Sequence, residues 1–260
     1  MISRFFSQSW LYAKAANAGL GLTEFFAYRA GISITTLILY VLIARYTQGD
    51  VDLTRWVMGN AFALCVYECI FGMGGYFNAE RFNGRLRSII ASPTSKLVVI
   101  MSSSVPSVII AFLTVTGAFL IGGLIFGVPF ANLNIPMFAI SITTAAFACV
   151  GLGLLFGAFA LLTDSMYLIL NALATLIMIF SGANFPVSQL PIFAQYIANA
   201  FPLFRSVAAG NLAMGGSFTP EFARLILGEA ALGAIYFAAA LALIKIIERT
   251  AIKKATLEMF

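Results

Sequence analysis

Residues 76–96 read YFNAERFNGRLRSIIASPTSK and form the one long polar connection between two strongly apolar stretches of the chain. Apolar side chains in this segment recur at the spacing of one helical face, while its arginines fall elsewhere on the helix. Pro93 ends the pattern, because proline has no amide hydrogen for a helical hydrogen bond. The segment therefore predicts an amphipathic helix over about 78–92, with an apolar face made of Phe82, Leu86, Ile89 and Ile90.

A short amphipathic helix between two membrane spans has two interpretations. Its apolar face can dock into a protein outside the bilayer, or the helix can rest on lipid headgroups as a solvated connection. The spacing of residues 78–92 alone leaves both open.

Composition places the chain in a membrane. Hydrophobic residues make up 61% of its 260 positions and charged residues only 10%, which is more apolar surface than a water-soluble domain can bury. The net charge of +5 does not indicate nucleic-acid binding, because the basic residues lie at the ends of apolar stretches. With no histidine, and with Cys65, Cys69 and Cys149 all inside apolar stretches, we expect packing cysteines and no metal site.

Apolar stretches long enough for membrane helices predict an all-α integral membrane protein, a single domain over 1–260. We expect residues 1–27, which mix aromatic and charged side chains, to form an interfacial helix. The six expected spans are about 28–44, 56–76, 97–128, 135–162, 166–181 and 222–247.

The stretch 185–203 is too apolar for an ordinary loop and is interrupted by prolines. It favours short helices that dip back into the membrane, a re-entrant segment, which is tolerated where protein or trapped water satisfies the broken backbone. A hairpin at headgroup level is the alternative. After it, residues 205–219 contain several glycines and predict a loop.

The distribution of basic residues predicts the orientation. Six spans place both termini on one side, and eleven of the fifteen Lys and Arg residues fall on that side, in the N-terminal segment, the 76–96 connection and the C-terminal end. Cytoplasmic loops carry such an excess, so both termini and the amphipathic helix are expected to be cytoplasmic.

Two motifs resemble a known family. Residues 80–93, ERFNGRLRSIIASP, resemble the pattern E-R-x-x-G-x-L-x-x-[LI]-[LI]-x-[ST]-P of type-2 ABC transporter permeases. Residues 182–191, GANFPVSQLP, are similar to the family's G-x-x-F-P-x-x-x-L-P segment, and its P-L end follows at Pro202. The hydrophobic pattern agrees over nearly the whole chain. The first thirty residues match loosely, and Arg85 stands where a small polar residue is more usual, which bears on the choice of partner or substrate.

The resemblance implies that the helix over about 78–92 is a coupling helix docked onto a separate ATP-binding cassette ATPase subunit. It implies an exporter permease of the bacterial inner membrane, working with a second copy of itself or a similar permease. ATP and Mg²⁺ would bind the ATPase, and no cofactor would bind this chain. The residues expected to couple to the ATPase are Glu80, Arg81, Phe82, Gly84, Leu86, Ile89, Ile90 and Pro93.

Glu68 is the carboxylate well inside the second expected span, where a charge is costly. At helical spacing it shares a stripe of small residues that should face protein. It either forms hydrogen bonds across helices to fix packing or lines an export path, and both interpretations stay open. The tentative path residues are Glu68, Phe185 and Pro186.

The chain contains no nucleotide-binding glycine loop and no hydrolase or metalloprotease motif. A membrane enzyme acting on a lipid substrate remains an alternative, although Glu68, Asp164 and Glu229 are scattered along the sequence. A membrane scaffold without an energy source is another. The cargo is not identified by the sequence; the lack of clustered basic residues on the outer side favours a hydrophobic or amphipathic one, such as a drug, peptide, lipid or lipid-linked glycan.

Overall fold

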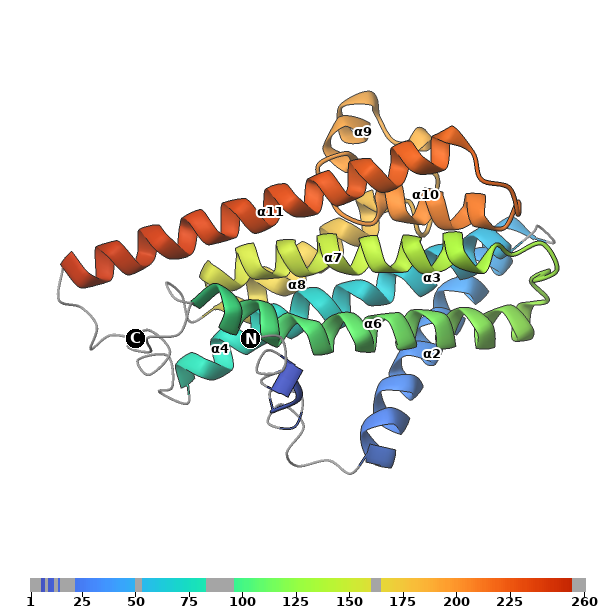
Figure 1. Cartoon of the computed structure of the whole chain (residues 1–260). Helices are drawn as coiled ribbons and strands as arrows, with labels where there is room; N and C mark the ends of the chain where they lie inside the picture. The colour runs from blue at the N-terminus through green and yellow to red at the C-terminus, as the bar shows by residue number, and fades with distance from the viewer. Residues whose placement is uncertain are drawn as a thin grey trace.

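The computed structural model describes residues 6–7, 9–11, 14, 22–49, 53–82, 96–159 and 165–253. Every regular element in these ranges is a helix (Figure 1). In chain order they are α2 Leu22–Gln48, α3 Thr54–Cys65, the π-helix η1 Val66–Phe71, α4 Gly72–Phe82, α6 Lys96–Phe126, α7 Ile135–Phe159, α8 Met166–Phe180, the 3₁₀ helix η2 Val187–Gln189, α9 Ile192–Ala198, α10 Phe204–Ala213 and α11 Pro220–Lys253.

The helices confirm a multi-pass membrane protein. Within the described ranges, four helical stretches are long and apolar enough to cross a bilayer: Thr54–Tyr76, Met101–Phe126, Ile135–Phe159 and Pro220–Ile247. Gly31–Thr47 and Met166–Phe180 are shorter apolar helices. The predicted count of six spans therefore stays a prediction.

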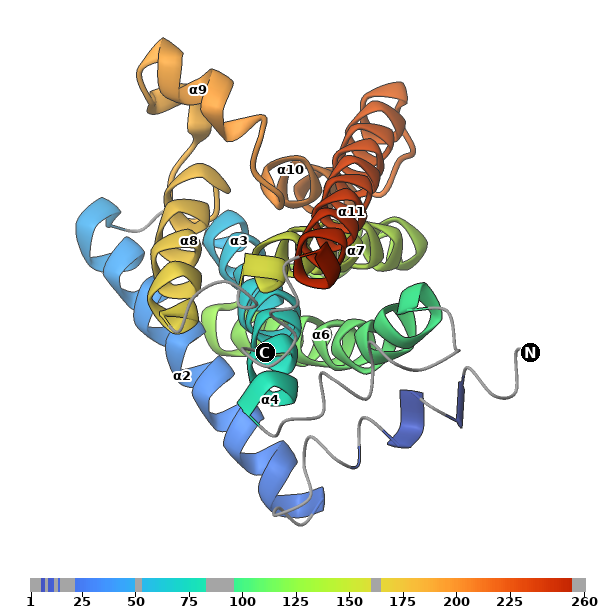
Figure 2. The same cartoon turned by 90° about the vertical axis from the view of Figure 1, so that its left-hand side faces the viewer.

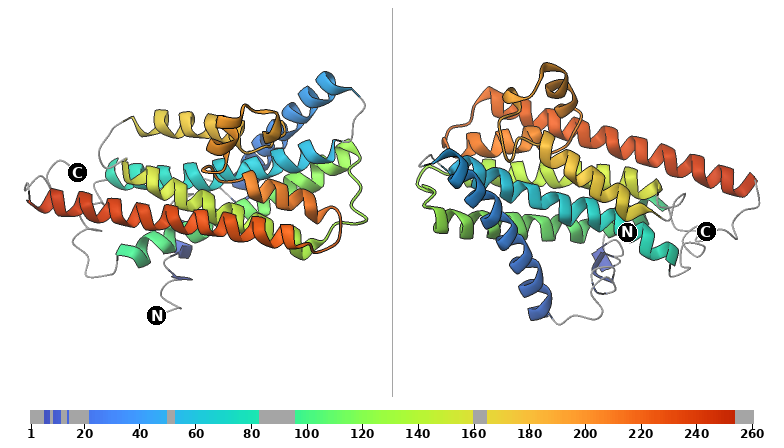
Figure 3. Two further views of the ribbon diagram at one scale, coloured as in Figure 1. Left: turned by 90° about the horizontal axis from the view of Figure 1, so that it is seen from above. Right: turned by 180° about the vertical axis from the view of Figure 1, so that it is seen from behind.

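One continuous helical rod, α3–η1–α4, forms the centre of the bundle. About it lie α2, α6, α7 and α8, while α2 crosses the other long helices steeply (Figures 2 and 3). In the most apolar 18 residues of Thr54–Tyr76, 83% of the residues are buried, against 17% in the corresponding part of Pro220–Ile247. The rod is therefore the core of the bundle, and α11 lies at its periphery with most of its surface facing outward.

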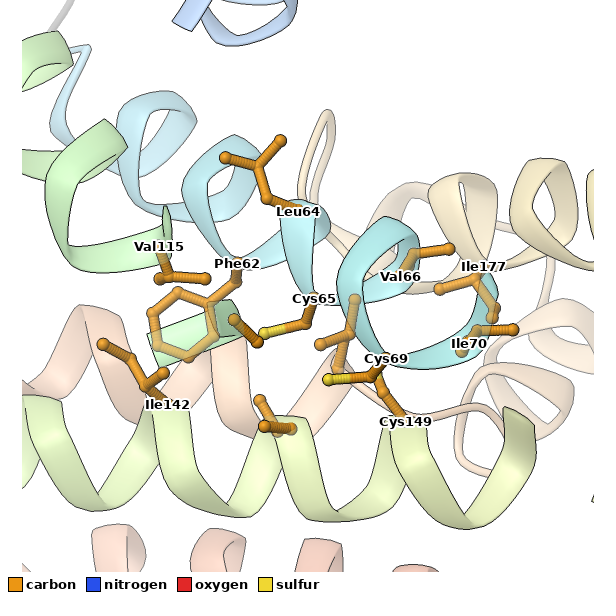
Figure 4. Close-up of a cluster of buried hydrophobic side chains, with 14 of the residues drawn as sticks. Phe62, Leu64, Cys65, Val66, Cys69, Ile70, Val115, Ile142, Cys149 and Ile177 are labelled. Carbon is orange, nitrogen blue, oxygen red and sulfur yellow. The ribbon is translucent and has the colours of Figure 1, made fainter. Parts of the chain in front are cut away.

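The core around the rod consists of aliphatic, aromatic and cysteine side chains (Figure 4). Phe62 packs edge-on against Phe138 of α7, with ring centroids 6.0 Å apart. Cys65, Cys69 and Cys149 are free thiols and fully buried, so the expectation that they pack inside the protein is confirmed.

Glycines bring three helices into backbone contact. A Cβ on Gly153 of α7 would lie 2.8 Å from the Cα of Ile70 in η1. A Cβ on Gly151, nearly opposite on α7, would lie 2.9 Å from the carbonyl oxygen of Gly233 in α11. α7 is thus held tightly between the rod and α11, as expected of small residues where lipid offers no hydrophobic drive for association.

Two expectations differ from the structure. α2 begins at Leu22, so residues 22–27 continue the first apolar helix instead of belonging to an interfacial one. Residues 205–213, expected as part of a loop, lie in α10. Among the small residues near Glu68 on this helix, Ala61 and Cys65 are buried, and a Cβ on Gly72 would lie 2.8 Å from Oγ of Ser107 in α6.

Candidate functional site

The segment expected to be the coupling helix begins at the end of the central rod. Glu80, Arg81 and Phe82 form the last turn of α4, and Glu80 is only 6% exposed. Figure 1 shows this end of α4 on the same side of the bundle as the start of α6 and the last turns of α11. The other residues expected to couple, Gly84, Leu86, Ile89, Ile90 and Pro93, lie outside the described residues.

The rod is longer than a bilayer is thick. α3, η1 and α4 contain 12, 6 and 11 residues, so at about 1.5 Å per residue they span roughly 43 Å. A hydrocarbon core is about 30 Å thick, which leaves part of the rod outside it. The sequence after Phe82 therefore starts from a helix that passes without interruption through the bundle core.

Glu68 lies in η1, inside the bundle of a single chain, and is 7% exposed. The prediction that it faces protein is confirmed. The same burial favours the packing interpretation over a path-lining one, because the surrounding helices of this chain already cover the side chain.

The candidate path residues Glu68, Phe185 and Pro186 lie in two separate places. Phe185 and Pro186 are half-buried and follow the end of α8. Their neighbour Ala183 contacts Gly59, which precedes Glu68 by about 14 Å of helix. Glu68 and the pair Phe185 and Pro186 thus belong to separate regions of the chain.

The re-entrant candidate, η2 and α9, is anchored to the rod at its N-terminal side. A Cβ on Gly59 would lie 2.6 Å from the Cα of Ala183, so only glycine permits this approach. The indole N–H of Trp56 donates a hydrogen bond to the carbonyl oxygen of Asn184 at 3.1 Å. The chain leaving α8 is therefore fixed against the first turns of α3.

A fully buried carboxylate, Glu229 of α11, holds the C-terminal side of the same segment. Its Oε1 accepts a hydrogen bond of 2.7 Å from the backbone N–H of Leu203, the residue before α10. Leu203 has φ +79°, a conformation that costs a non-glycine residue about 1–3 kcal/mol. About two turns further along α11, the hydroxyl of Tyr236 donates a hydrogen bond to the carbonyl oxygen of Ala200.

The position of Glu229 suits a hydrogen-bond acceptor. Helix N-termini present unpaired N–H groups and a partial positive charge, and both favour an anion there. Glu229 is thus a positioning residue that sequence reasoning missed; the available signal was a carboxylate inside an otherwise apolar 222–247 stretch.

A pocket of about 360 Å³ opens beside these anchors, where α3 and α11 begin. Arg55 of α3 and Glu221 of α11 both line it. The remaining lining residues are Ser181, Gly182, Val187, Phe204, Val207, Ala208, Asn211, Leu212 and Leu225. Over the described part of the chain, no three His, Cys, Asp or Glu side chains come together as metal ligands would.

The sequence of this chain matches a known protein family. A family model described as "ABC-2 type transporter" matches residues 13–210, most of the chain, including both motifs at 80–93 and 182–191. The chain belongs to the ABC-2 type transporter family. No match was found among curated proteins. The ABC-2 permease domain is a transport component and is not itself catalytic, and such permeases normally work with an ATPase partner.

Proposed function

We propose that this ABC-2 permease is the membrane-spanning subunit of an ATP-driven exporter. Two copies, or one copy and a similar permease, form the translocation path, and each docks onto a separate ATPase through residues 78–92. ATP and Mg²⁺ bind that ATPase. Family membership supports a transport role, and the unbroken rod from Thr54 to Phe82 supports the coupling role.

The rod is the main support for this proposal. The expected docking segment begins in the last turns of the rod, and the Thr54–Tyr76 part of the rod is the most buried of the four long spans. Any displacement of residues 78–92 by a partner acts directly on the α4 end of that helix. The π turn of η1 and the close contact with Gly153 lie about midway along it. Movement of the ATPase at residues 78–82 would thus act on a helix that continues into the bundle core.

The proposed orientation places both termini and residues 78–92 in the cytoplasm of a bacterial cell, with six spans in the inner membrane. α2 and α8 are then the two spans beyond the four long ones. The segment with η2 and α9 dips into the membrane from the outer side. The proposed cargo is hydrophobic or amphipathic, and Glu68, Phe185 and Pro186 remain candidates for its path.

Replacing Leu86 with Asp tests the coupling role. An aspartate on the expected apolar face would be buried unpaired against the ATPase, at a cost of about 3–5 kcal/mol, so copurification of an ATP-binding cassette ATPase and export should both be lost. Membrane insertion should persist. The experiment measures the ATPase bound to the tagged, full-length permease.

Ser88→Asp is the matched control, since it introduces the same charge away from the face of Phe82, Leu86, Ile89 and Ile90. It should retain the ATPase. If Leu86→Asp retains the ATPase and exports as the unmodified chain does, residues 78–92 are a headgroup-level connection and the coupling role is wrong.

A further inference from the structure

The pocket between α3 and α11 contains two opposite charges at the level of the membrane surface. Arg55 is the second residue of α3 and Glu221 the second residue of α11, and the candidate spans Thr54–Tyr76 and Pro220–Ile247 start at those helix ends. The first turn of a span lies where hydrocarbon gives way to phospholipid headgroups.

Among the described residues, neither charge has a partner. Arg55 is half-buried and Glu221 exposed, and neither makes a hydrogen bond or ion pair with any residue that the structure describes. A guanidinium is a strong donor for phosphate, because its fork of N–H groups matches two phosphate oxygens. A carboxylate at the same pocket attracts a cationic group.

The remaining walls suit the part of a ligand that carries no charge. Val187, Phe204 and Leu225 supply apolar surface, and Gly182 and Asn211 supply polar backbone and amide groups. A volume of about 360 Å³ is within the range of small-molecule sites, roughly 300–1,000 Å³. The pocket can therefore take a headgroup together with the first atoms of an apolar tail.

We propose that this pocket binds a zwitterionic phosphate ester, with its phosphate on Arg55 and its ammonium group on Glu221. Such a ligand is either the headgroup of a zwitterionic phospholipid or a soluble phosphoalkylamine. The surface depth of both charges and the apolar walls favour the phospholipid. The site is independent of the transport role, since it needs neither an ATPase nor a second permease.

Trp56 provides the measurement, because it follows Arg55 directly and the chain contains one other tryptophan, Trp10. The full chain with Trp10→Phe, purified in a neutral detergent, is titrated with dihexanoyl phosphatidylethanolamine. Trp56 emission should change with saturation. Dihexanoyl phosphatidylglycerol, which has the phosphate but no ammonium group, should bind at least about tenfold more weakly.

Two variants test whether Arg55 binds the phosphate and Glu221 the ammonium group. Arg55→Gln should weaken phosphatidylethanolamine binding by about tenfold or more, since a charge-assisted hydrogen bond is lost. Glu221→Gln should abolish the preference over phosphatidylglycerol. Arg224→Gln is the matched control, because Arg224 is exposed on the first turns of α11 and does not line the pocket; it should bind like the parent.

Phosphoethanolamine, which lacks acyl chains, separates the two ligand sources. Binding much weaker than that of the phospholipid supports a lipid site, whereas equal binding overturns the lipid source. A non-saturating titration, or an Arg55→Gln chain that binds like the parent, overturns the site itself. If Arg55→Gln does not fold, Ala208→Trp decides: it fills the pocket and should abolish binding, and unchanged binding contradicts the proposal.

Discussion

The two ends of the helix bundle are built in different ways. At one end, the α3–η1–α4 rod leads directly into residues 83–95, and neighbours in sequence are neighbours along one helix. At the other, the chain between α8 and α11 is fixed by distant residues: Gly59 against Ala183, and Glu229 against Leu203. Substitutions at the first end should therefore act on partner binding, whereas substitutions at the second should act on the stability of the fold.

In the proposed orientation the two ends of the bundle face opposite sides of the membrane, and thiol labelling tests this with an all-or-none result. In a chain whose three buried cysteines are replaced by alanine, Thr47→Cys and Ser217→Cys should react in intact cells with an impermeant maleimide. Thr47 and Ser217 are exposed, beside the starts of α3 and α11. Thr256→Cys should stay unlabelled until the cells are permeabilised; labelling before that would reverse the proposed orientation.

Gly59→Ala should cause the largest loss of stability at the anchored end. Its methyl group would lie 2.6 Å from the Cα of Ala183, and a backbone atom cannot move aside as a side chain can. Overpacking of this kind costs about 1–3 kcal/mol, so the thermal unfolding temperature in detergent should fall clearly.

Gly117→Ala is the matched control for that substitution. Gly117 is also inside a long helix, but a Cβ there would have no atom within 4 Å. Alanine is the better helix former, so this variant should unfold at or slightly above the parent's temperature. Equal unfolding temperatures for Gly59→Ala and Gly117→Ala would show that the Ala183 contact yields easily.

Glu229→Leu should have an intermediate effect. It leaves the buried N–H of Leu203 without its acceptor, which costs about 1–3 kcal/mol, and removes an anion from the N-terminus of α10. Glu229→Gln retains an acceptor and should lose less. Hydrogen exchange of amides 200–206 reports the change: faster exchange is expected in the leucine variant, and equal exchange in both variants would remove the carboxylate from the anchor.

Glu68→Gln should have the smallest effect. Because Glu68 is buried within its own chain, an amide that keeps most hydrogen bonds should leave unfolding temperature and export near those of the parent. Export of several unrelated cargoes from cells is the measurement. A changed cargo range in a stable protein would move Glu68 from packing to the translocation path.

Hydrophobic runs predicted the helices well, since an apolar run in lipid has few alternatives to a helix. They did not predict the role of residues that contact a part of the chain far away in sequence. Gly210 read as part of a glycine-containing loop, yet it lies within α10, where a Cβ would come 3.0 Å from the ring of Phe62. A glycine that permits helix packing and one that permits a turn look alike in sequence.

Only some of the candidate site residues could be predicted from the sequence. The motif at 80–93 is local, so its residues could be named, although most of them lie outside the described ranges. Glu229 could not be assigned a role, because its partner Leu203 is 26 residues away in a segment without helical periodicity. The π turn has no periodic signal of its own, so the sequence predicted an ordinary helix through Glu68.

The contact between Gly151 and Gly233 has a mechanical consequence. Side chains between two helices can change rotamer and so absorb a small sliding or rolling motion, but backbones in direct contact have no such compliance. α7 and α11 should therefore move together as one rigid unit. Since Glu229 and Tyr236 attach residues 200–203 to α11, a tilt of this pair of helices would move the start of α10 as well.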